Sequence, residues 1–515
     1  MLDVKETIQI ATSHRLVVGN VVTRIDPPIR GEHHAILKKK LGYQPEESFW
    51  MSRGKGHWDG WITTLCFDKA RCRCHEKHDG MHFPTGCLSV VRQYFEESNI
   101  SYSVFDGRNK VEKTKRFSIS DKIKLRDYQK RIIEAGSKKG RGIVKAATGA
   151  GKTVISAALI AELDAVPVVF LVTSRDLMHQ ARKELQSVIL DMGKPAKIGA
   201  IGGGVFEPED ITIMTVQTAV RSLGMSYKKF DDDEDDEKDS SYDGSKQQII
   251  KDLIENCTIM ICDEIQHWAA ETCQIVSNSM KKARFRFGVS ATPWRDQGDD
   301  ILIDGCFGKP VAEVSASELI KANVLVKPHI FFIPVSSNMG GSYHDVYKKC
   351  IVSNEHRNHI VKSMAEQLIG SNRKVLILVR MIEHGKILES MIDGSVFISG
   401  ETDKKKRDDI LSRMRAGHPG VVIASTIFDE GIDAKPLDAL ILAGAGKSPT
   451  RALQRIGRVI RSNENKKDAI VIDFFDDVKY LRTHSKKREK LYRSEKEFVV
   501  NRIGKDMDLF GEISL

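Results

Sequence analysis

Cysteine, proline and aromatic residues are all sparse in this sequence, and no apolar run is long enough to cross a membrane. Only 9 cysteines and 14 prolines occur among 515 residues, and aromatic residues make up 7%. An odd number of scattered cysteines, without a secretory signal, argues against a disulfide framework and predicts reduced thiols. A membrane span needs about 20 consecutive apolar residues. We therefore expect a cytoplasmic globular protein without disulfides or a membrane anchor.

The chain carries an excess of positive charge. Its 80 lysines and arginines against 70 acidic residues give a formal net charge of +10, and the pI is near 9.0. Basic side chains bind polyanions by releasing counterions from phosphates, so nucleic acid is one predicted partner. A basic but otherwise ordinary surface is the alternative, and charge alone does not separate the two. The length leaves room for about three domains.

The stretch 146–153, with the sequence AATGAGKT, predicts a phosphate-binding loop. An apolar run precedes it and a helical pattern follows, an order that directs backbone N–H groups and a helix N-terminus at a polyphosphate. We expect Lys152 to reach the β- and γ-phosphates and the Thr153 hydroxyl to hold Mg²⁺. Ala146 replaces the glycine of the strict pattern. The other residues predicted to bind the nucleotide here are Thr148, Gly149, Ala150 and Gly151.

Two acidic residues follow an apolar strand predicted over 259–262. We expect Asp263 to lie on the Mg²⁺ side of the nucleotide and Glu264 to polarise a water for in-line attack. Such a pair is common in plain turns, but a Lys-Thr loop upstream makes it specific. Upstream of that loop, Arg126 and Gln129 are candidates for binding the base, because a glutamine amide matches the donor and acceptor edges of adenine.

Hydroxyl, amide and basic side chains follow several predicted strands of an α/β sheet, where ligand-binding loops lie. These groups suit contacts to a phosphate backbone without base reading. Ordinary capping of helix N-termini is an equally good explanation for each one alone. The candidates are Thr173, Ser174, Arg175, Gln217 and Thr218, together with Thr426 in the second half of the chain.

The second half of the chain contains no further phosphate loop but has the sequence QRIGRVIR over 454–461. On a helix, Arg458 and Arg461 are three residues apart and project from one face. Two guanidinium groups could then converge on the γ-phosphate as arginine fingers, with Gln454 beside them. A solvated basic helix is the alternative. Gly431 and Asp433, which follow another buried strand, are further candidates for the nucleotide site.

The alternation of apolar strands and amphipathic helices predicts an α/β fold of doubly wound parallel sheets with helices on both faces. We place a small α+β domain at residues 1–118, one α/β domain at 119–330 and a second at 331–515. The run of acidic residues within 230–246 predicts a solvated, disordered insertion, and mimicry of nucleic acid is the less favoured alternative. The basic tail 486–502 predicts a helix that is solvated or tracks phosphates.

The first 118 residues combine aromatic and basic side chains. Lys55 and Trp58 could contact phosphates and stack on bases, although close tryptophans are more often the core of a small domain. Four cysteines, with nearby histidines, could form a tetrahedral zinc site. Their irregular spacing favours a polar loop instead. These cysteines are Cys66, Cys72, Cys74 and Cys87.

Taken in order, these motifs resemble the superfamily 2 helicases and translocases. The resemblance covers about 400 residues and rests on the glutamine, the AxTGxGKT loop, Asp263-Glu264, the Ser-Ala-Thr sequence 290–292, the EGID sequence 430–433 and QRxGRxxR. The stretch TPWR at 292–295 is similar to XPB/Rad25-like translocases. The sequence GHWDGWI at 56–62 is similar to the UvsW-type helicases of T4-like bacteriophages.

The resemblance implies two tandem RecA-like domains and an accessory nucleic-acid-binding domain at the N-terminus. It implies an ATP- and Mg²⁺-dependent enzyme that unwinds branched DNA, migrates junctions and anneals strands. The expected setting is a monomer in the host cytoplasm, acting beside recombination or replication proteins. An RNA helicase, and a nucleotide-gated DNA clamp without productive turnover, are the rival interpretations.

Overall fold

The structure is a computed structural model, and the chain divides into two compact units. The first comprises Met1–Lys145 and Lys152–Glu313, and the second comprises Ala146–Gly151 and Val314–Leu515. Among the residues that the structure describes, no helix has the length and apolar character of a membrane span. The described residues are 13–45, 60–67, 80–225, 243–294, 298–415, 420–425, 437–444, 446, 448–462, 466 and 468–503.

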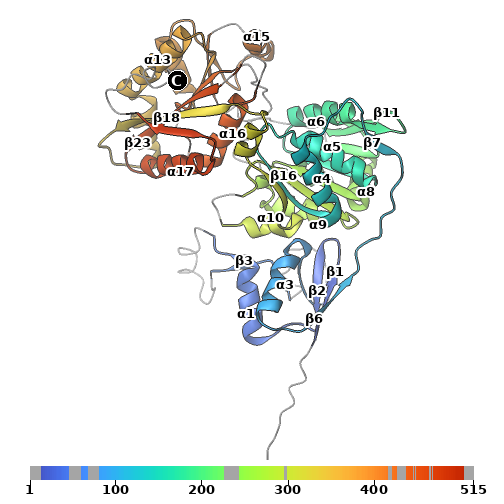
Figure 1. Ribbon diagram of the computed structural model, residues 1–515. Coiled ribbons are helices and arrows are strands. Elements are labelled where there is room, and N and C mark those ends of the chain that lie inside the picture. Colours follow the sequence, from blue (N-terminus) through green and yellow to red (C-terminus); the bar gives the residue numbers. More distant parts are fainter. Residues whose placement is uncertain are drawn as a thin grey trace, which may run out of the picture. The chain divides into compact units, whose positions relative to one another are not determined.

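In its described residues, the first unit begins with a small module of a four-stranded sheet and two helices (Figure 1). The strand order is β5-β2-β1-β6, with β1 parallel to β6 and antiparallel to β2. Leu16, Leu37, Phe83 and Phe95 are fully buried in its core, which confirms the predicted α+β module. Its elements are β1 (His14–Val18), β2 (Val22–Asp26), α1 (Gly31–Lys40), β3 (Gly42–Tyr43), β4 (Ile62–Thr63), β5 (Met81–Pro84), η2 (Thr85–Cys87), α3 (Leu88–Glu97) and β6 (Tyr102–Asp106).

This module packs closely on the rest of the first unit. Asn20 donates its side-chain amide to the Lys281 carbonyl at 3.0 Å. Gly86 lies so close to the helix α10 (Asp300–Phe307) that an added Cβ would come within 2.0 Å of the Asp304 carbonyl oxygen. Only glycine therefore allows this approach, and the module is fastened by backbone contact.

The first unit is built on an eight-stranded sheet with the order β13-β12-β14-β9-β15-β16-β8-β17. From β12 to β8 every neighbouring pair is parallel, so the carboxyl ends of these strands meet at one edge. The strands are β8 (Arg141–Ala146), β9 (Val168–Val172), β12 (Ile198–Gly202), β13 (Val205–Glu207), β14 (Ile211–Thr215), β15 (Ile259–Asp263), β16 (Phe285–Ser290) and β17 (Pro310–Val314). The other elements are α4 (Asp127–Lys139), α5 (Lys152–Leu163), α6 (Arg175–Val188), α7 (Val216–Ser222), α8 (Gly244–Asn256), η3 (Ile265–His267), α9 (Glu271–Ser279) and the small sheet of β7 (Phe117–Ile119), β10 (Ile189–Asp191) and β11 (Lys194–Pro195).

The second unit has a seven-stranded sheet, in the order β20-β21-β19-β22-β23-β18-β24, in which every neighbouring pair is parallel. The strands are β18 (Lys327–Ser336), β19 (Val375–Leu378), β20 (Val396–Ile398), β21 (Val421–Ala424), β22 (Ala439–Ile441), β23 (Asp468–Asp477) and β24 (Val499–Arg502). The helices are α11 (Ala316–Lys321), α12 (Tyr343–Tyr347), η4 (Lys348–Val352), α13 (Glu355–Gly370), α14 (Ile382–Met391), α15 (Lys404–Arg415), α16 (Pro449–Val459) and α17 (Leu481–Ser494).

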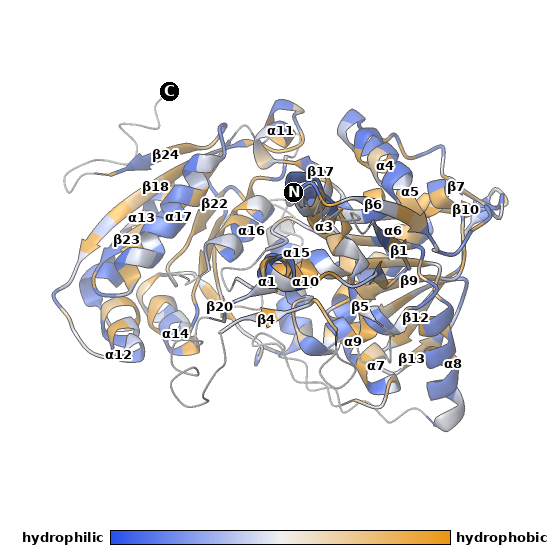
Figure 2. Cartoon of the chain, turned by 90° about the horizontal axis from the view of Figure 1, so that it is seen from below, coloured by the Kyte–Doolittle hydropathy of each residue, from blue (hydrophilic) through white to orange (hydrophobic). Residues whose placement is uncertain are grey.

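Hydrophobic colouring follows the strands of both large sheets, and the surrounding helices show hydrophilic and hydrophobic stripes (Figure 2). Parallel strands covered by helices on both faces are expected to be apolar throughout. The central strands β9 and β14 are buried along their whole length. The predicted α/β architecture of two parallel sheets with a small N-terminal module is thereby confirmed.

Two details differ from the sequence prediction. The boundary predicted between residues 330 and 331 falls inside β18, and the two units separate between Glu313 and Val314. The predicted basic helix over 486–502 is wrong in its second half, because α17 ends at Ser494 and the chain continues as β24. The basic residues there include Arg502, whose Nη2 pairs with Glu489 at 2.5 Å. A local charge pattern does not reveal that a tail returns as an edge strand.

We expect His384 to make stability depend on pH. It is fully buried on α14, and Nε2 pairs with the Asn358 side-chain oxygen at 3.0 Å. Burial and then the charge of Arg357 lower its pKa to about 3, below the usual 6.5. Since the unfolded chain takes up the proton first, stability is complete above pH 6.5 and falls as the pH approaches 3, by about 2 kcal/mol at pH 5.

The His384→Gln variant should therefore lose about 2 kcal/mol less than the wild type between pH 7.5 and pH 5 in urea unfolding. His359→Gln, at an exposed position of α13, is the matched control and should behave as the wild type. Equal pH dependence in His384→Gln and the wild type would contradict the prediction.

Candidate nucleotide site

The loop between β8 and α5 turns on two glycines with positive φ. Gly149 has φ +93° and Gly151 has φ +77°, backbone conformations that residues other than glycine rarely adopt. Ala146, by contrast, is the last residue of β8 and is fully buried. Because this position has strand geometry, it does not require glycine. The replacement seen in the sequence is therefore accommodated without strain.

Lys152, the first residue of α5, bonds to both acidic residues at the end of β15. Its Nζ donates to Glu264 Oε1 at 2.7 Å and lies 3.6 Å from Asp263 Oδ1. The sheet places these groups together, because β15 and β8 flank β16 and all three end at the same edge. A lysine of the loop and two carboxylates thus form one compact charged cluster.

The pKa values of the two carboxylates of the cluster shift in opposite directions. Burial is the largest influence on both and raises the pKa of Asp263. For Glu264, the charge of Lys152 and its hydrogen bond outweigh burial and hold the pKa well below the usual value. Glu264 is therefore an ionised carboxylate, able to accept a hydrogen bond from a water.

Gln266 connects this cluster to the next strand. Its Nε2 donates to Glu264 Oε2 at 3.0 Å, and its Oε1 accepts from Ser290 Oγ at 2.8 Å. Ser290 Oγ in turn accepts from the Thr292 backbone N–H at 3.1 Å. Glu264 itself has φ +48°, an unusual conformation for a residue with a side chain. Glu264 is held in this position by Lys152 on one oxygen and Gln266 on the other.

The donor set near Lys152 fits a magnesium ion bound with a nucleotide. The hydroxyl of Thr153 belongs to the first turn of α5, and the carboxylate of Asp263 ends β15. Magnesium prefers oxygen ligands and usually binds through one or two protein groups together with substrate phosphates. Among the described residues there is no cluster of three or more His, Cys, Asp or Glu side chains that would hold a metal on its own.

Arg126 and Gln129 lie at the N-terminus of α4. Gln129 Oε1 accepts a hydrogen bond from the Arg126 backbone N–H at 3.0 Å, so the glutamine caps the helix. Its side chain is 3% exposed, which shows that it is not a solvated surface glutamine. Whether its amide also binds a base stays a prediction.

The predicted backbone-binding residues of the first unit meet at the carboxyl edge of the sheet. Gln217 Nε2 donates to the Thr173 carbonyl at 2.7 Å, which links the ends of the adjacent strands β9 and β14. Ser174 accepts from the Leu177 N–H and caps α6, as the simpler interpretation expected. Thr218 is buried, and its hydroxyl accepts a hydrogen bond from the Thr215 hydroxyl, so Thr218 supports the loop from the protein interior.

Arg175 begins α6 and packs on Gly203, where a Cβ would come 2.7 Å from Arg175 Cδ.

Other predicted site residues lie outside the described residues. These are Lys55 and Trp58, Thr426, Gly431 and Asp433, and the cysteines Cys72 and Cys74 of the zinc hypothesis. Cys66 and Cys87 are buried, and burial raises the pKa of the Cys87 thiol. Residues 230–242 of the insertion predicted over 230–246 also lie outside the described residues. The prediction of disorder is wrong for its last residues, because Asp243 caps α8, which begins at Gly244.

The helix α16 carries Gln454 and Arg458 but not Arg461. It begins with Ser448 as N-cap and Pro449 in the first turn, and it ends at Val459. Arg461 follows the helix and forms an isolated β-bridge with Leu325. The prediction that Arg458 and Arg461 share one helix face is therefore wrong. A helix pattern in sequence does not show where tertiary pairing ends the helix.

Comparison with known proteins identifies the class. The family model described as type III restriction enzyme, res subunit, matches residues 122–295, and the helicase conserved C-terminal domain matches residues 357–463. Together they match more than half of the chain, in the order in which the two sheets occur. The chain belongs to the superfamily 2 helicases, with two tandem RecA-like domains.

Within that superfamily two relatives are informative. The DNA 3'-5' translocase XPB2 of Sulfurisphaera tokodaii is 27% identical over 426 residues, covering 74% of this chain and 88% of the relative. The ATP-dependent DNA helicase uvsW of Enterobacteria phage T4 is 22% identical over 470 residues, covering 84% and 85%. The chain spans between 54% and 65% of the length of three other relatives.

A solved structure supports the fold. The ATP-dependent type ISP restriction-modification enzyme LlaBIII, bound to DNA, matches with a TM-score of 0.52 and 16% identity. The match covers 76% of this chain and 32% of that enzyme.

Gln266 is a site residue that sequence reasoning missed, although it lies only two residues after the acidic pair. Replacing it with alanine should reduce kcat for ATP about tenfold, since Glu264 loses the partner that orients one of its oxygens. Steady-state phosphate release measures the effect. Gln247→Ala, which removes a single amide bond to the Ser222 carbonyl at 3.1 Å, is the matched control. Equal rates for the two variants would contradict the role of Gln266.

Proposed function

We propose that the protein is an ATP-dependent DNA helicase or translocase that acts on branched or duplex DNA. The observation that carries the proposal is the cluster of Lys152, Asp263 and Glu264 at the carboxyl edge of a parallel sheet, beside a loop with two positive-φ glycines. Proteins of similar sequence are named as DNA translocases and helicases, which favours DNA as the substrate.

Each group of the cluster has a step to perform in hydrolysis. Lys152 leaves Glu264 and binds the β- and γ-phosphates of ATP, which carry more negative charge than one carboxylate. Glu264 is then free to accept a hydrogen bond from the attacking water and to orient it. Thr153 and Asp263 would hold Mg²⁺, which neutralises charge developing on the phosphate oxygens. Gln266 and Ser290 connect the position of Glu264 to the loop at Thr292.

We propose that the second unit supplies the remaining groups. Arg458 and Arg461 of that unit would stabilise charge on the γ-phosphate, with Gln454 nearby, while Arg126 and Gln129 of the first unit would bind the base. Such a division makes hydrolysis depend on domain closure, so each turnover could move the units along a phosphate backbone. This proposal rests on the resemblance of QRIGRVIR to the superfamily motif and on the absence of a second phosphate loop in the sequence.

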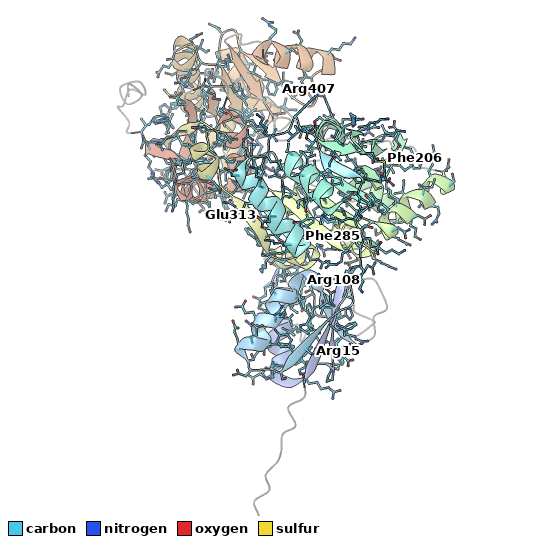
Figure 3. The ribbon with its side chains drawn as sticks, turned by 45° about the vertical axis from the view of Figure 1, so that its right-hand side comes forward. Arg15, Arg108, Phe206, Phe285, Glu313 and Arg407 are labelled. Carbon is cyan, nitrogen blue, oxygen red and sulfur yellow. The ribbon has the colours of Figure 1, made fainter. Side chains whose placement is uncertain are left out.

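The N-terminal module offers a surface suited to nucleic acid. In the register of β1, β2 and β6, Arg15, Arg24 and Phe105 lie on the same sheet face. Arg15 lies on β1 in Figure 3, and its guanidinium is 4.6 Å from the Phe105 ring centroid. Phe105 is 49% exposed, which is unusual for a large apolar side chain. An exposed ring beside arginines can stack a base and contact phosphates.

The proposed setting follows the phage relative. We propose a monomer in the cytoplasm of an infected host, acting with recombination or replication proteins. An RNA helicase and a DNA clamp without turnover remain the rivals, and they differ in which polynucleotide stimulates phosphate release and in whether phosphate is released at all.

Lys152→Ala and Glu264→Gln should each lower DNA-stimulated phosphate release by at least a thousandfold, since one loses the phosphate ligand and the other the water-orienting carboxylate. Lys138→Ala, which removes an exposed ion pair to Glu134, is the control and should keep full activity. The assay should compare single-stranded, duplex, forked and four-way DNA with RNA. Stimulation by RNA alone would favour the RNA helicase, and no release with any polynucleotide would favour the clamp.

Phe105→Ala should weaken binding of single-stranded DNA by about tenfold, since base–aromatic stacking contributes roughly 1–3 kcal/mol per base. Fluorescence anisotropy with a labelled oligonucleotide at fixed salt measures the affinity. Phe67→Ala, at another exposed phenylalanine of the same module, is the matched control. Unchanged affinity in Phe105→Ala would exclude this face as the contact surface.

A further inference from the structure

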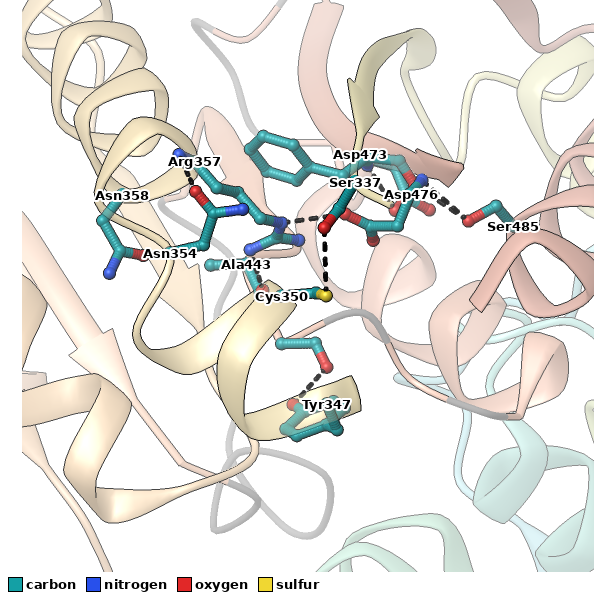
Figure 4. Close-up of polar contacts among 12 residues, drawn as sticks. Ser337, Tyr347, Cys350, Asn354, Arg357, Asn358, Ala443, Asp473, Asp476 and Ser485 are labelled. Atoms are coloured by element: carbon teal, nitrogen blue, oxygen red, sulfur yellow. Dashed lines mark hydrogen bonds and ion pairs between the residues drawn. The ribbon is translucent and has the colours of Figure 1, made fainter. Parts of the chain in front are cut away.

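Three buried side chains of the second unit hold the loop that leads from β22 into α16. Arg357 Nη1 donates to the Ala443 carbonyl at 2.7 Å, and Tyr347 Oη donates to the Gly444 carbonyl at 2.7 Å (Figure 4). Arg488 Nη1 donates to the Gly446 carbonyl at 3.0 Å. Backbone carbonyls of a loop are thus bound by donors from α13, α12 and α17, three separate helices.

Each arginine is fixed by its own carboxylate on β23. Arg357 Nε donates to Asp476 Oδ1 at 2.9 Å. Arg488 binds both oxygens of Asp473, at 2.8 and 2.9 Å, and Tyr492 donates to the same carboxylate at 3.0 Å. Since side chains of a strand alternate, residues 473 and 476 face opposite sides of the sheet. The loop is therefore held from both faces.

Ion pairs this deeply buried are not explained by stability. Arg357 and Arg488 are no more than 1% exposed, and Asp473 and Asp476 no more than 2%. Removing charges from water costs as much as such pairs regain, so well-packed apolar residues would stabilise the fold equally well. What apolar residues could not do is bind carbonyl groups at defined points of a loop. The arrangement therefore points to a requirement for position.

The described residues of this loop have little room for movement. The Gly444 N–H donates to the Leu378 carbonyl at 2.8 Å, and a Cβ there would lie 2.7 Å from the Arg380 nitrogen. Two residues after Gly446, Ser448 caps α16 through the Arg451 N–H. Fixing the loop thus fixes the start of the helix that carries Gln454 and Arg458.

We propose that Tyr347, Arg357 and Arg488 are positioning residues that set α16, and with it Arg458, for ATP hydrolysis. The inference rests on the proposed function. Losing one of these contacts lets α16 shift while the fold and the phosphate loop remain intact. The rate of the chemical step should then fall, whereas the affinity for ATP should not.

Tyr347→Phe is the sharpest test, because it removes one hydroxyl only. Tyr94→Phe is matched to it: each tyrosine is 4% exposed, and each hydroxyl makes a 2.7 Å hydrogen bond, that of Tyr94 to His33 in the N-terminal module. We expect Tyr347→Phe to lower kcat about fivefold with KM for ATP unchanged. Amide exchange of residues 442–459 should become faster. Tyr94→Phe should leave kcat, KM for ATP and this amide exchange unchanged.

Arg357→Lys extends the test, since a lysine can pair with Asp476 but cannot also reach Ala443 in the same fixed geometry. Its kcat should fall further than that of Tyr347→Phe. If Arg357→Lys does not fold, the comparison of Tyr347→Phe with Tyr94→Phe still tests the inference. Equal kcat and equal amide exchange in the two tyrosine variants would overturn the inference while leaving the proposed function intact. A wild-type chain that releases no phosphate with any polynucleotide would overturn both.

Discussion

The meeting of parallel strands at one edge of a sheet is the constraint on which the candidate site depends. It brings together the end of β8, the acidic pair at the end of β15 and Ser290 at the end of β16, although the end of β8 lies more than a hundred residues before the other two in the chain. In that setting Lys152 binds two carboxylates that would otherwise repel each other. A bound polyphosphate would take over the lysine, which leaves Glu264 charged and available to a water.

The second unit uses buried charge differently. Asp473 and Asp476 on β23 bind two arginines, and those arginines bind carbonyl oxygens of the segment before α16. In the first unit, charge is placed where a ligand would compete for it. In the second, Arg357, Arg488, Asp473 and Asp476 are all buried, which suits a support that stays in place.

Some elements of the site could be predicted because their chemistry is local. The loop 146–153 and Asp263-Glu264 follow apolar strands, and the structure places them as the pattern indicated. Gln266 was missed because nothing in its type or spacing shows that its amide joins Glu264 to Ser290. Arg461 was assigned to the wrong element because its pairing partner, Leu325, lies far away in sequence. Tyr347, Arg357 and Arg488 belong to no recognisable motif.

Sequence alone determined the class of the fold, the order of the two sheets and the residue types that could bind a nucleotide. These follow from periodicity, glycine position and charge, all of which act over a few residues. The tertiary structure decided where the units divide, where α16 ends, which residues hold Glu264, and that two buried arginines support the loop before α16. Each of these depends on contacts between distant segments, whose distances no local pattern encodes.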